Sequence, residues 1–259
     1  DFVKYLHETY TEKYIRLSFS YIIFYYACQS SNIDIINYLY EKYNFNEIVS
    51  NLDIYHNPLE NYARMSNIKC IDHIIQLIPN INFKLINNCL LICMTDKYKY
   101  QELFEYLMNK FGDNFNFYHY YTISDDDEKQ SALTIACRYG QIEYVKYILD
   151  NYPHEGDYTF YRYITFESCM SGNNELIDYL YNKFSKIEEI FKNCEFLENV
   201  IFNKINLDTM KFIISKFSEN DLRFLINYFE KVNITNNKIV DWIRDGCKMP
   251  ERKIKCADF

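Results

Sequence analysis

The sequence predicts an all-α protein, a solenoid of about seven helix-turn-helix repeats with a partial repeat at its N-terminus. Three observations support this prediction. One seven-residue apolar pattern recurs along the chain at intervals near 33 residues, each copy fits a short amphipathic helix, and small or polar turn residues precede the copies. A repeat this short cannot bury its apolar face alone, so neighbouring repeats must stack to form a core.

The most complete repeat lies at Ser131–Leu149, with the sequence SALTIACRYGQIEYVKYIL. It predicts a short apolar first helix over Leu133–Cys137 and a second helix over Ile142–Leu149. The two are separated by a turn at Gly140, a residue type that tolerates turn conformations closed to other residues. The pattern of the second helix identifies the other repeats.

Copies of the second helix define the order of elements along the chain. They lie at Ile33–Leu39, Ile68–Ile74, Gln101–Leu107, Asn174–Leu180, Leu207–Ile213 and Asn237–Ile243, with a truncated copy at Phe2–Leu6. We therefore predict one domain over residues 1–259, with units ending near residues 6, 39, 74, 107, 148, 180, 213 and 243 and a C-terminal tail over residues 244–259. Because the truncated copy lacks a first helix, we expect a longer native chain.

Two positions of the second helix repeat a residue type and are predicted to be structural. An asparagine precedes most copies, where its side-chain oxygen can cap the first turn: Asn32, Asn67, Asn173, Asn206 and Asn236. An aromatic residue near the end of every copy except Ile68–Ile74, which has His73 there, is predicted to pack between neighbouring second helices: Tyr5, Tyr38, Tyr106, Tyr147, Tyr179, Phe212 and Trp242.

The repeat at Ser131–Leu149 resembles the ankyrin repeat. Ser131–Thr134 resembles the T-P-L-H start of that family, Ala136-Cys137 matches its small residues, and Gly140 to Val145 fits its G-x-x-E-ϕ-V stretch. The resemblance implies a turn, two antiparallel helices and a loop that projects toward the next unit. No other unit has a T-P-L-H equivalent and none ends in Gly-Ala-Asp, so we expect irregular loops.

The resemblance also implies where a partner binds. Ankyrin proteins commonly bind through the concave face made by their first helices and loop tips, to which the pair of residues after the small residues points. Carried over by position, this surface comprises Gln29, Ser30, Arg64, Met65, Arg138, Tyr139, Met170, Ser171, Asn203 and Lys204.

An enlarged connection over Phe111–Gln130 accounts for the longest interval between repeats, and it mixes aromatic residues with the acidic run Asp125–Glu128. One interpretation is a solvated loop. The other is a recognition finger anchored by Phe117, Tyr118, His119 and Tyr120, because aromatic residues beside acids suit a basic, partly apolar partner surface.

Composition and motifs argue against other classes of protein. The net charge of −8 opposes binding of nucleic acid, and no apolar run reaches the roughly 18 residues of a membrane span. Nine cysteines without a C-x-x-C pair indicate a reducing, intracellular and cytoplasmic setting. Cys89 and Cys93 have the spacing of two metal ligands, but no nearby pair completes a site. The chain contains no catalytic motif and no phosphate-binding glycine loop, so we predict no enzyme, cofactor or metal.

The predicted function is that of a non-catalytic scaffold that binds a protein partner, whose identity stays open together with the oligomeric state. The Tyr-, Ile-, Asn- and Lys-rich style of the helices is similar to that of ankyrin proteins of giant DNA viruses and AT-rich amoebae. Two alternatives follow. One is an adaptor or effector that recruits host proteins, for example to a ubiquitin ligase. The other is a structural component of a large assembly such as a virion.

Overall fold

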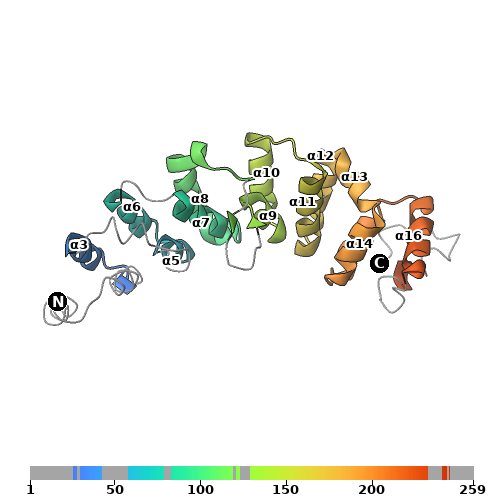
Figure 1. The fold of residues 1–259 in the computed structure, drawn as a ribbon, viewed down its shortest axis with the longest axis horizontal. Coiled ribbons are helices and arrows are strands. Elements are labelled where there is room, and N and C mark those ends of the chain that lie inside the picture. The colour runs from blue at the N-terminus through green and yellow to red at the C-terminus, as the bar shows by residue number, and fades with distance from the viewer. Residues whose placement is uncertain are drawn as a thin grey trace. The chain divides into compact units, whose positions relative to one another are not determined.

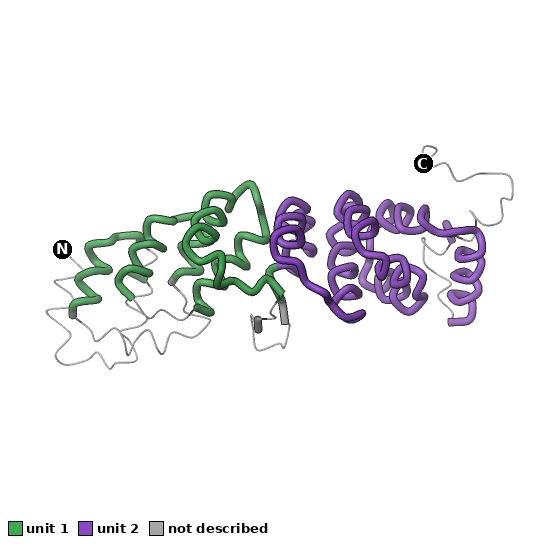
Figure 2. Tube along the Cα trace, turned by 90° about the horizontal axis from the view of Figure 1, so that it is seen from above, with its two compact units in different colours: residues 1–132 green, residues 133–259 purple. Residues whose placement is uncertain are grey.

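The computed structural model describes residues 26–27, 30–42, 58–78, 83–118, 121–122, 129–232, 241–243 and 245 (Figure 1). The described residues are predominantly helical, which confirms the all-α prediction, and their one departure is a pair of two-residue strands. Contacts along the chain divide it into two compact units, residues 1–132 and residues 133–259 (Figure 2). The predicted unit ending near residue 6 and the tail over residues 244–259 lie outside the described residues, apart from Asp245.

The first unit is built from helical hairpins. α5 and α6 form one hairpin, α7 and α8 form the next, and α5 packs against α7 so that the two first helices lie side by side. Leu59 and Tyr62 of α5 and Leu90 of α7 are fully buried. The elements are α3 (Ile33–Lys42), α5 (Pro58–Arg64), α6 (Ile68–Leu77), α7 (Phe83–Cys93), α8 (Lys97–Phe111), the 3-10 turn η2 (Gly112–Asn114), β1 (Tyr121–Thr122) and β2 (Lys129–Gln130).

The second unit continues the pattern in the hairpins α9/α10, α11/α12 and α14/α15. The first helix α11 packs against α14, and α14 packs against α16, which stands where the first helix of a further repeat belongs. The elements are α9 (Ala132–Arg138), α10 (Ile142–Asn151), α11 (Tyr158–Ser171), α12 (Asn174–Lys183), α13 (Ser185–Phe191), α14 (Cys194–Phe202), α15 (Leu207–Ile214) and α16 (Glu219–Lys231).

Helix α13 is an additional element that the repeat pattern does not predict. It contacts α11, α12 and α14, and its Ile187, Ile190 and Phe191 are buried. The ring of Phe191 stacks on that of Tyr181 in α12 at a centroid distance of 5.9 Å. The segment SKIEEIF thus fills space between two repeats with its own apolar face, as an amphipathic helix does.

The turn between the two helices of a repeat has one recurring backbone conformation. The N–H of its key residue donates to the carbonyl three residues earlier, as from Gly140 to Cys137 at 3.0 Å and from Gly172 to Cys169 at 3.2 Å. Among the described residues, those with positive φ all occupy this position, which favours glycine because a Cβ crowds the backbone there. They are Ser31 (54°), Ser66 (52°), Gly140 (65°), Gly172 (72°) and Lys204 (63°).

Asparagine caps join two of the second helices, α6 and α12, to the repeat before them. The side-chain oxygen of Asn173 accepts hydrogen bonds from the backbone N–H groups of Glu175 and Leu176, both at 3.1 Å, which satisfies two unpaired donors of α12. Its amide nitrogen donates to the carbonyl of Gly140 at 2.8 Å. Asn67 likewise caps α6 and donates to the Ser31 hydroxyl at 3.1 Å. The cap therefore contributes both to its helix and to the stacking of repeats.

The second helices are also linked to one another by a recurring polar contact. In the first unit the hydroxyl of Tyr106 donates to Asp72 at 2.7 Å, and Lys110 forms an ion pair with the same carboxylate oxygen. In the second unit Lys183 pairs with Asp150 at 2.5 Å and Lys216 with Asp178 at 2.5 Å. In each case the lysine lies four residues after an aromatic residue whose ring it approaches, as Lys110 does with Tyr106 at 5.4 Å.

Candidate partner-binding surface

The turn register defines equivalent surface positions in every repeat. We call the two residues before the key turn residue the tip positions. By this register they are Arg64 and Met65 before Ser66, Arg138 and Tyr139 before Gly140, and Met170 and Ser171 before Gly172. Gln29 and Ser30 precede Ser31 in the same way, and Gln29 lies outside the described residues.

The register changes one predicted pair. Lys204 has the positive φ of the turn residue, so the tip positions of that repeat are Phe202 and Asn203 rather than Asn203 and Lys204. The shift arises because one extra residue, the buried Ile205, separates the turn residue from the capping Asn206. The shift corresponds to a longer spacing in the sequence between the end of α14, at Phe202, and the capping Asn206.

Several tip side chains are large, apolar and exposed. The exposed fraction is 59% for Met65, 54% for Tyr139 and 63% for Phe202. Met170 and Ser171 are half-buried, and Ser30, Asn203 and Lys204 are exposed. The repeat of α7 and α8 differs. Its turn residue by hydrogen bonding is Thr95, whose N–H donates to the Ile92 carbonyl at 3.0 Å, and the tip residues before it, Cys93 and Met94, are buried. The described tip positions therefore present apolar contacts at separate repeats.

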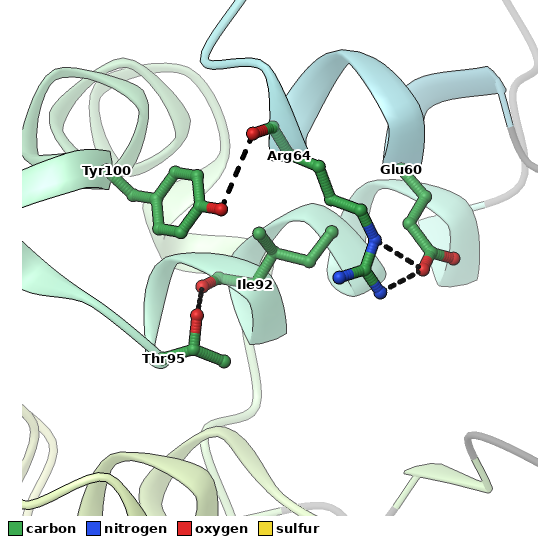
Figure 3. Close-up of polar contacts among 5 residues, drawn as sticks. All are labelled: Glu60, Arg64, Ile92, Thr95 and Tyr100. Carbon is green, nitrogen blue, oxygen red and sulfur yellow. Dashed lines mark hydrogen bonds and ion pairs between the residues drawn. The ribbon is translucent and has the colours of Figure 1, made fainter.

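The tip at Arg64 and Met65 in the first unit is stabilised by polar contacts within α5 and with α8 (Figure 3). The Arg64 guanidinium pairs with Glu60, one helical turn earlier in α5, at 2.7 Å from Nη2. The backbone carbonyl of Arg64 accepts a hydrogen bond from the Tyr100 hydroxyl at 3.5 Å, and Thr95 donates to the carbonyl of Ile92 at 2.7 Å. The end of α5 is thus held against the start of α8.

Arg138 occupies the equivalent position in the second unit and makes a different contact. Its Nε and Nη2 donate to the two carboxylate oxygens of Glu167 in α11, at 2.7 and 2.8 Å. The Glu167 side chain is 4% exposed and that of Arg138 is 32% exposed. Because this bidentate pair compensates a buried charge and joins α9 to α11, Arg138 has a structural role at the tip.

The structure separates the four predicted anchors of the enlarged connection. Phe117 is 1% exposed, and its ring lies 6.1 Å from that of Phe115, which in turn lies 5.3 Å from Phe83. Phe117 is therefore part of the apolar core of the first unit and is no surface anchor. Tyr118 is half-buried, and the predicted anchors His119 and Tyr120 lie outside the described residues. After them, Tyr121 pairs with Gln130 and Thr122 with Lys129 in an antiparallel strand pair.

The described cysteines are poor candidates for reactive thiols. Cys70, Cys89, Cys93, Cys137, Cys169 and Cys194 are free and buried. Burial raises the pKa of Cys137 to about 12 and raises the pKa of Cys89, Cys93 and Cys169 as well, which opposes formation of the thiolate. Within the described ranges, no group of three or more His, Cys, Asp and Glu residues could hold a metal ion. No helix in the described part of the chain has the length and apolarity needed to span a bilayer.

Comparison with known proteins identifies one repeat. A family model described as Ankyrin repeat matches residues 128–156, which include the hairpin α9/α10 and the Ser131–Leu149 unit. This match supports the ankyrin character of that repeat and, with the helical hairpins, the ankyrin type of the fold. No curated protein and no solved structure matches the chain.

Proposed function

We propose that the chain is a non-catalytic scaffold that binds a protein partner through the tip positions and the adjoining faces of its first helices. The observation that carries the proposal is the exposure of large apolar side chains at equivalent tips, namely Met65, Tyr139 and Phe202. Large apolar and aromatic side chains in such positions supply much of the binding energy of protein interfaces. An ankyrin repeat at residues 128–156 supports a role in protein–protein interaction.

The frame behind these tips supports binding by rigid display. The Asn173 cap and its bond to Gly140 tie one repeat to the previous one, and the Arg138–Glu167 pair ties α9 to α11. A preordered backbone loses little conformational entropy when a partner binds, so more of the contact energy appears as affinity. The tip residues can therefore contribute to binding without contributing much to folding.

Composition supports an intracellular protein with a protein ligand. The described thiols are free, as is usual in a reducing compartment, and the net charge of −8 repels the phosphates of nucleic acid. We propose the cytoplasm as its place of action, in a host cell if the chain is viral.

Affinity capture with the full chain tests the proposal, read by quantitative mass spectrometry and confirmed with purified partner. The test variant combines Met65→Ser, Tyr139→Ser and Phe202→Ser. The matched control combines Tyr98→Ser and Leu207→Ser, which remove exposed apolar side chains of the second helices α8 and α15, 90% and 37% exposed. We expect at least one partner to be lost by the tip variant and retained by the control.

The identity of that partner decides between narrower roles. A ubiquitin-ligase subunit together with a second captured protein would favour the adaptor, and stable stoichiometric association with coat proteins would favour a virion component. A partner retained by the tip variant but lost when residues 119–128 are replaced by a Gly-Ser linker, which spares the buried Phe115 and Phe117, would place binding on the enlarged connection instead. No specific capture by the unaltered chain would contradict the scaffold proposal.

A further inference from the structure

The face formed by α14 and α16 carries exposed apolar side chains at both of its ends. On α14, Phe202 is 63% exposed, and on α16, Phe224 is 65% exposed. Val232, which caps the C-terminus of α16, is 38% exposed. α14 packs against α16, so the two helices lie side by side in the second unit.

Two carboxylates lie on the same surface. Glu195, Glu198 and Phe202 are spaced i, i+3 and i+7, which places them on one side of α14. Phe224, Tyr228 and Val232 are spaced i, i+4 and i+8 along one side of α16. The hydroxyl of Tyr228 donates to Oε2 of Glu198 at 2.7 Å, so the two sides meet at this hydrogen bond. We call these six residues the α14/α16 face.

The charge of the two carboxylates is uncompensated within the described residues. Several other acids of the second unit have cation partners there: Glu167 pairs with Arg138, Glu188 with Lys192 and Glu219 with Arg223. Neither Glu195 nor Glu198 forms an ion pair in the described part of the chain. The hydrogen bond to Glu198, with further contributions from burial and the charge of Glu195, raises the pKa of Tyr228 to about 12. The local field at the middle of the face is therefore negative.

From this arrangement we infer that the α14/α16 face binds a peptide segment of the partner that carries Lys or Arg between two large apolar side chains. The basic side chain pairs with Glu195 and Glu198, and the apolar side chains cover Phe224, Val232 and Phe202. This inference rests on the proposed scaffold function and names the chemistry of its ligand.

The length of the face sets the spacing of the ligand. Phe224 and Val232 are eight residues apart on α16, about 12 Å at 1.5 Å per helical residue. An extended peptide covers that distance in about four residues at roughly 3.3 Å each. The expected motif is therefore an apolar residue, one or two basic residues, and a second apolar residue about four positions after the first.

Selection from a display library of random 12-residue peptides against the full chain tests the inference. We expect enrichment of the apolar–basic–apolar motif and at least tenfold weaker binding of the selected peptides to the variant Glu195→Gln/Glu198→Gln. The amide introduced by Glu198→Gln keeps a hydrogen-bond acceptor for Tyr228, so the face stays intact. The control Glu189→Gln removes an exposed charge of α13 and should leave affinity unchanged. Binding should also weaken with added salt and with Phe202→Ala, while Tyr98→Ala has no effect.

Three results would overturn the inference: enrichment of acidic or uncharged motifs, equal affinity for the glutamine variant, or no enrichment. The capture experiment separates this failure from failure of the scaffold proposal. A cellular partner that depends on Met65 and Tyr139 but binds the glutamine variant normally would leave the scaffold function standing and reject the α14/α16 face as its site.

Discussion

The side-chain amide of Asn173 donates a hydrogen bond to the backbone carbonyl of Gly140, 2.8 Å away and 33 residues earlier in the chain. The same side chain caps α12 through its oxygen. One residue thus satisfies backbone groups of two successive repeats.

Replacing Asn173 by alanine should lower the free energy of unfolding by about 1–3 kcal/mol, because the helix loses its cap and the turn loses a donor. Asn173→Asp should cost less, since a carboxylate still caps the helix but cannot donate to Gly140. Urea denaturation followed by circular dichroism measures both. Gln141→Ala serves as the control, because Gln141 makes no side-chain cap bond at the start of α10. Equal losses for the alanine and aspartate variants would show that the bond to Gly140, rather than the cap, accounts for the whole effect.

Lys204 stands at a turn position that favours glycine, with φ of 63°. Lys204→Gly should raise the free energy of unfolding by about 0.5–1 kcal/mol, because relief of left-handed strain exceeds the added entropy of the unfolded chain. Thermal unfolding followed by calorimetry measures the gain.

The reverse change at the equivalent position is expected to destabilise. In Gly172→Ala the new Cβ would lie 2.6 Å from Nδ2 of Asn206, at a φ of 72°, so the cap of α15 must shift. We expect a loss of about 2 kcal/mol or more from the left-handed strain and the displaced cap together. The free energy of unfolding should rise in Lys204→Gly and fall in Gly172→Ala. A lower free energy of unfolding in Lys204→Gly would contradict left-handed strain at Lys204.

The second helices could be predicted from the sequence because apolar period and capping residue agree there. Helices α3, α6 and α15 begin at the predicted residues Ile33, Ile68 and Leu207, each directly after its asparagine. Helix α10 begins at the predicted Ile142 on its apolar pattern alone, because Gln141 makes no side-chain cap bond. Helix α8 begins at Lys97, four residues before its predicted start, because Asp96 rather than asparagine caps it. For α8, which lacks the capping asparagine, the apolar pattern alone therefore predicts the first residue of the helix to within about one helical turn.

The candidate surface could be predicted only in part, because exposure depends on tertiary contacts. Phe117 belongs to an aromatic-rich connection, and nothing in its local pattern shows that it packs beside Phe115. The repeat pattern does not predict Phe202 as a tip residue, because the inserted Ile205 moves the turn by one residue without changing the repeat interval. The repeat pattern does not predict helix α13 either, because this helix lies within an interval of the usual length, between Leu180 and Ile213.

Asp72, Tyr106 and Lys110 should make stability depend on pH at both extremes. The hydrogen bond from Lys110, followed by that from Tyr106, lowers the pKa of Asp72. The resulting contribution of Asp72 to the free energy of unfolding is fully present above about pH 4, the pKa of this carboxyl in the unfolded chain. It is lost as the pH falls through the lower pKa of Asp72 in the folded chain. Burial and the bond to Asp72 raise the pKa of Tyr106 to about 12, so its contribution is present below about pH 10 and is lost as the pH rises toward 12.

Asp72→Asn should therefore reduce the melting temperature at pH 7, with a difference from the unaltered chain that shrinks below about pH 4. The effect should stay under about 1 kcal/mol, because the Asp72–Lys110 pair is partly exposed to solvent. Melting curves recorded from pH 3 to pH 11 test this, with Glu189→Gln as a charge-matched control. A difference that persists unchanged at pH 3 would contradict the linkage.

Arg64 and Arg138 occupy the same tip position, yet only one of them compensates a buried charge. Glu60, the partner of Arg64, is 26% exposed at its side chain, whereas Glu167, the partner of Arg138, is 4% exposed. Arg138→Ala should cost about 2–4 kcal/mol, because it leaves a buried carboxylate unpaired. Arg64→Ala should cost about 0.5 kcal/mol or less, as exposed pairs within one helix do. Urea denaturation of both variants decides the matter. If Arg138→Ala/Glu167→Gln recovers most of the stability lost by Arg138→Ala, the unpaired carboxylate is the cause. If the double variant is no more stable than the single one, the loss comes from packing of the arginine side chain instead.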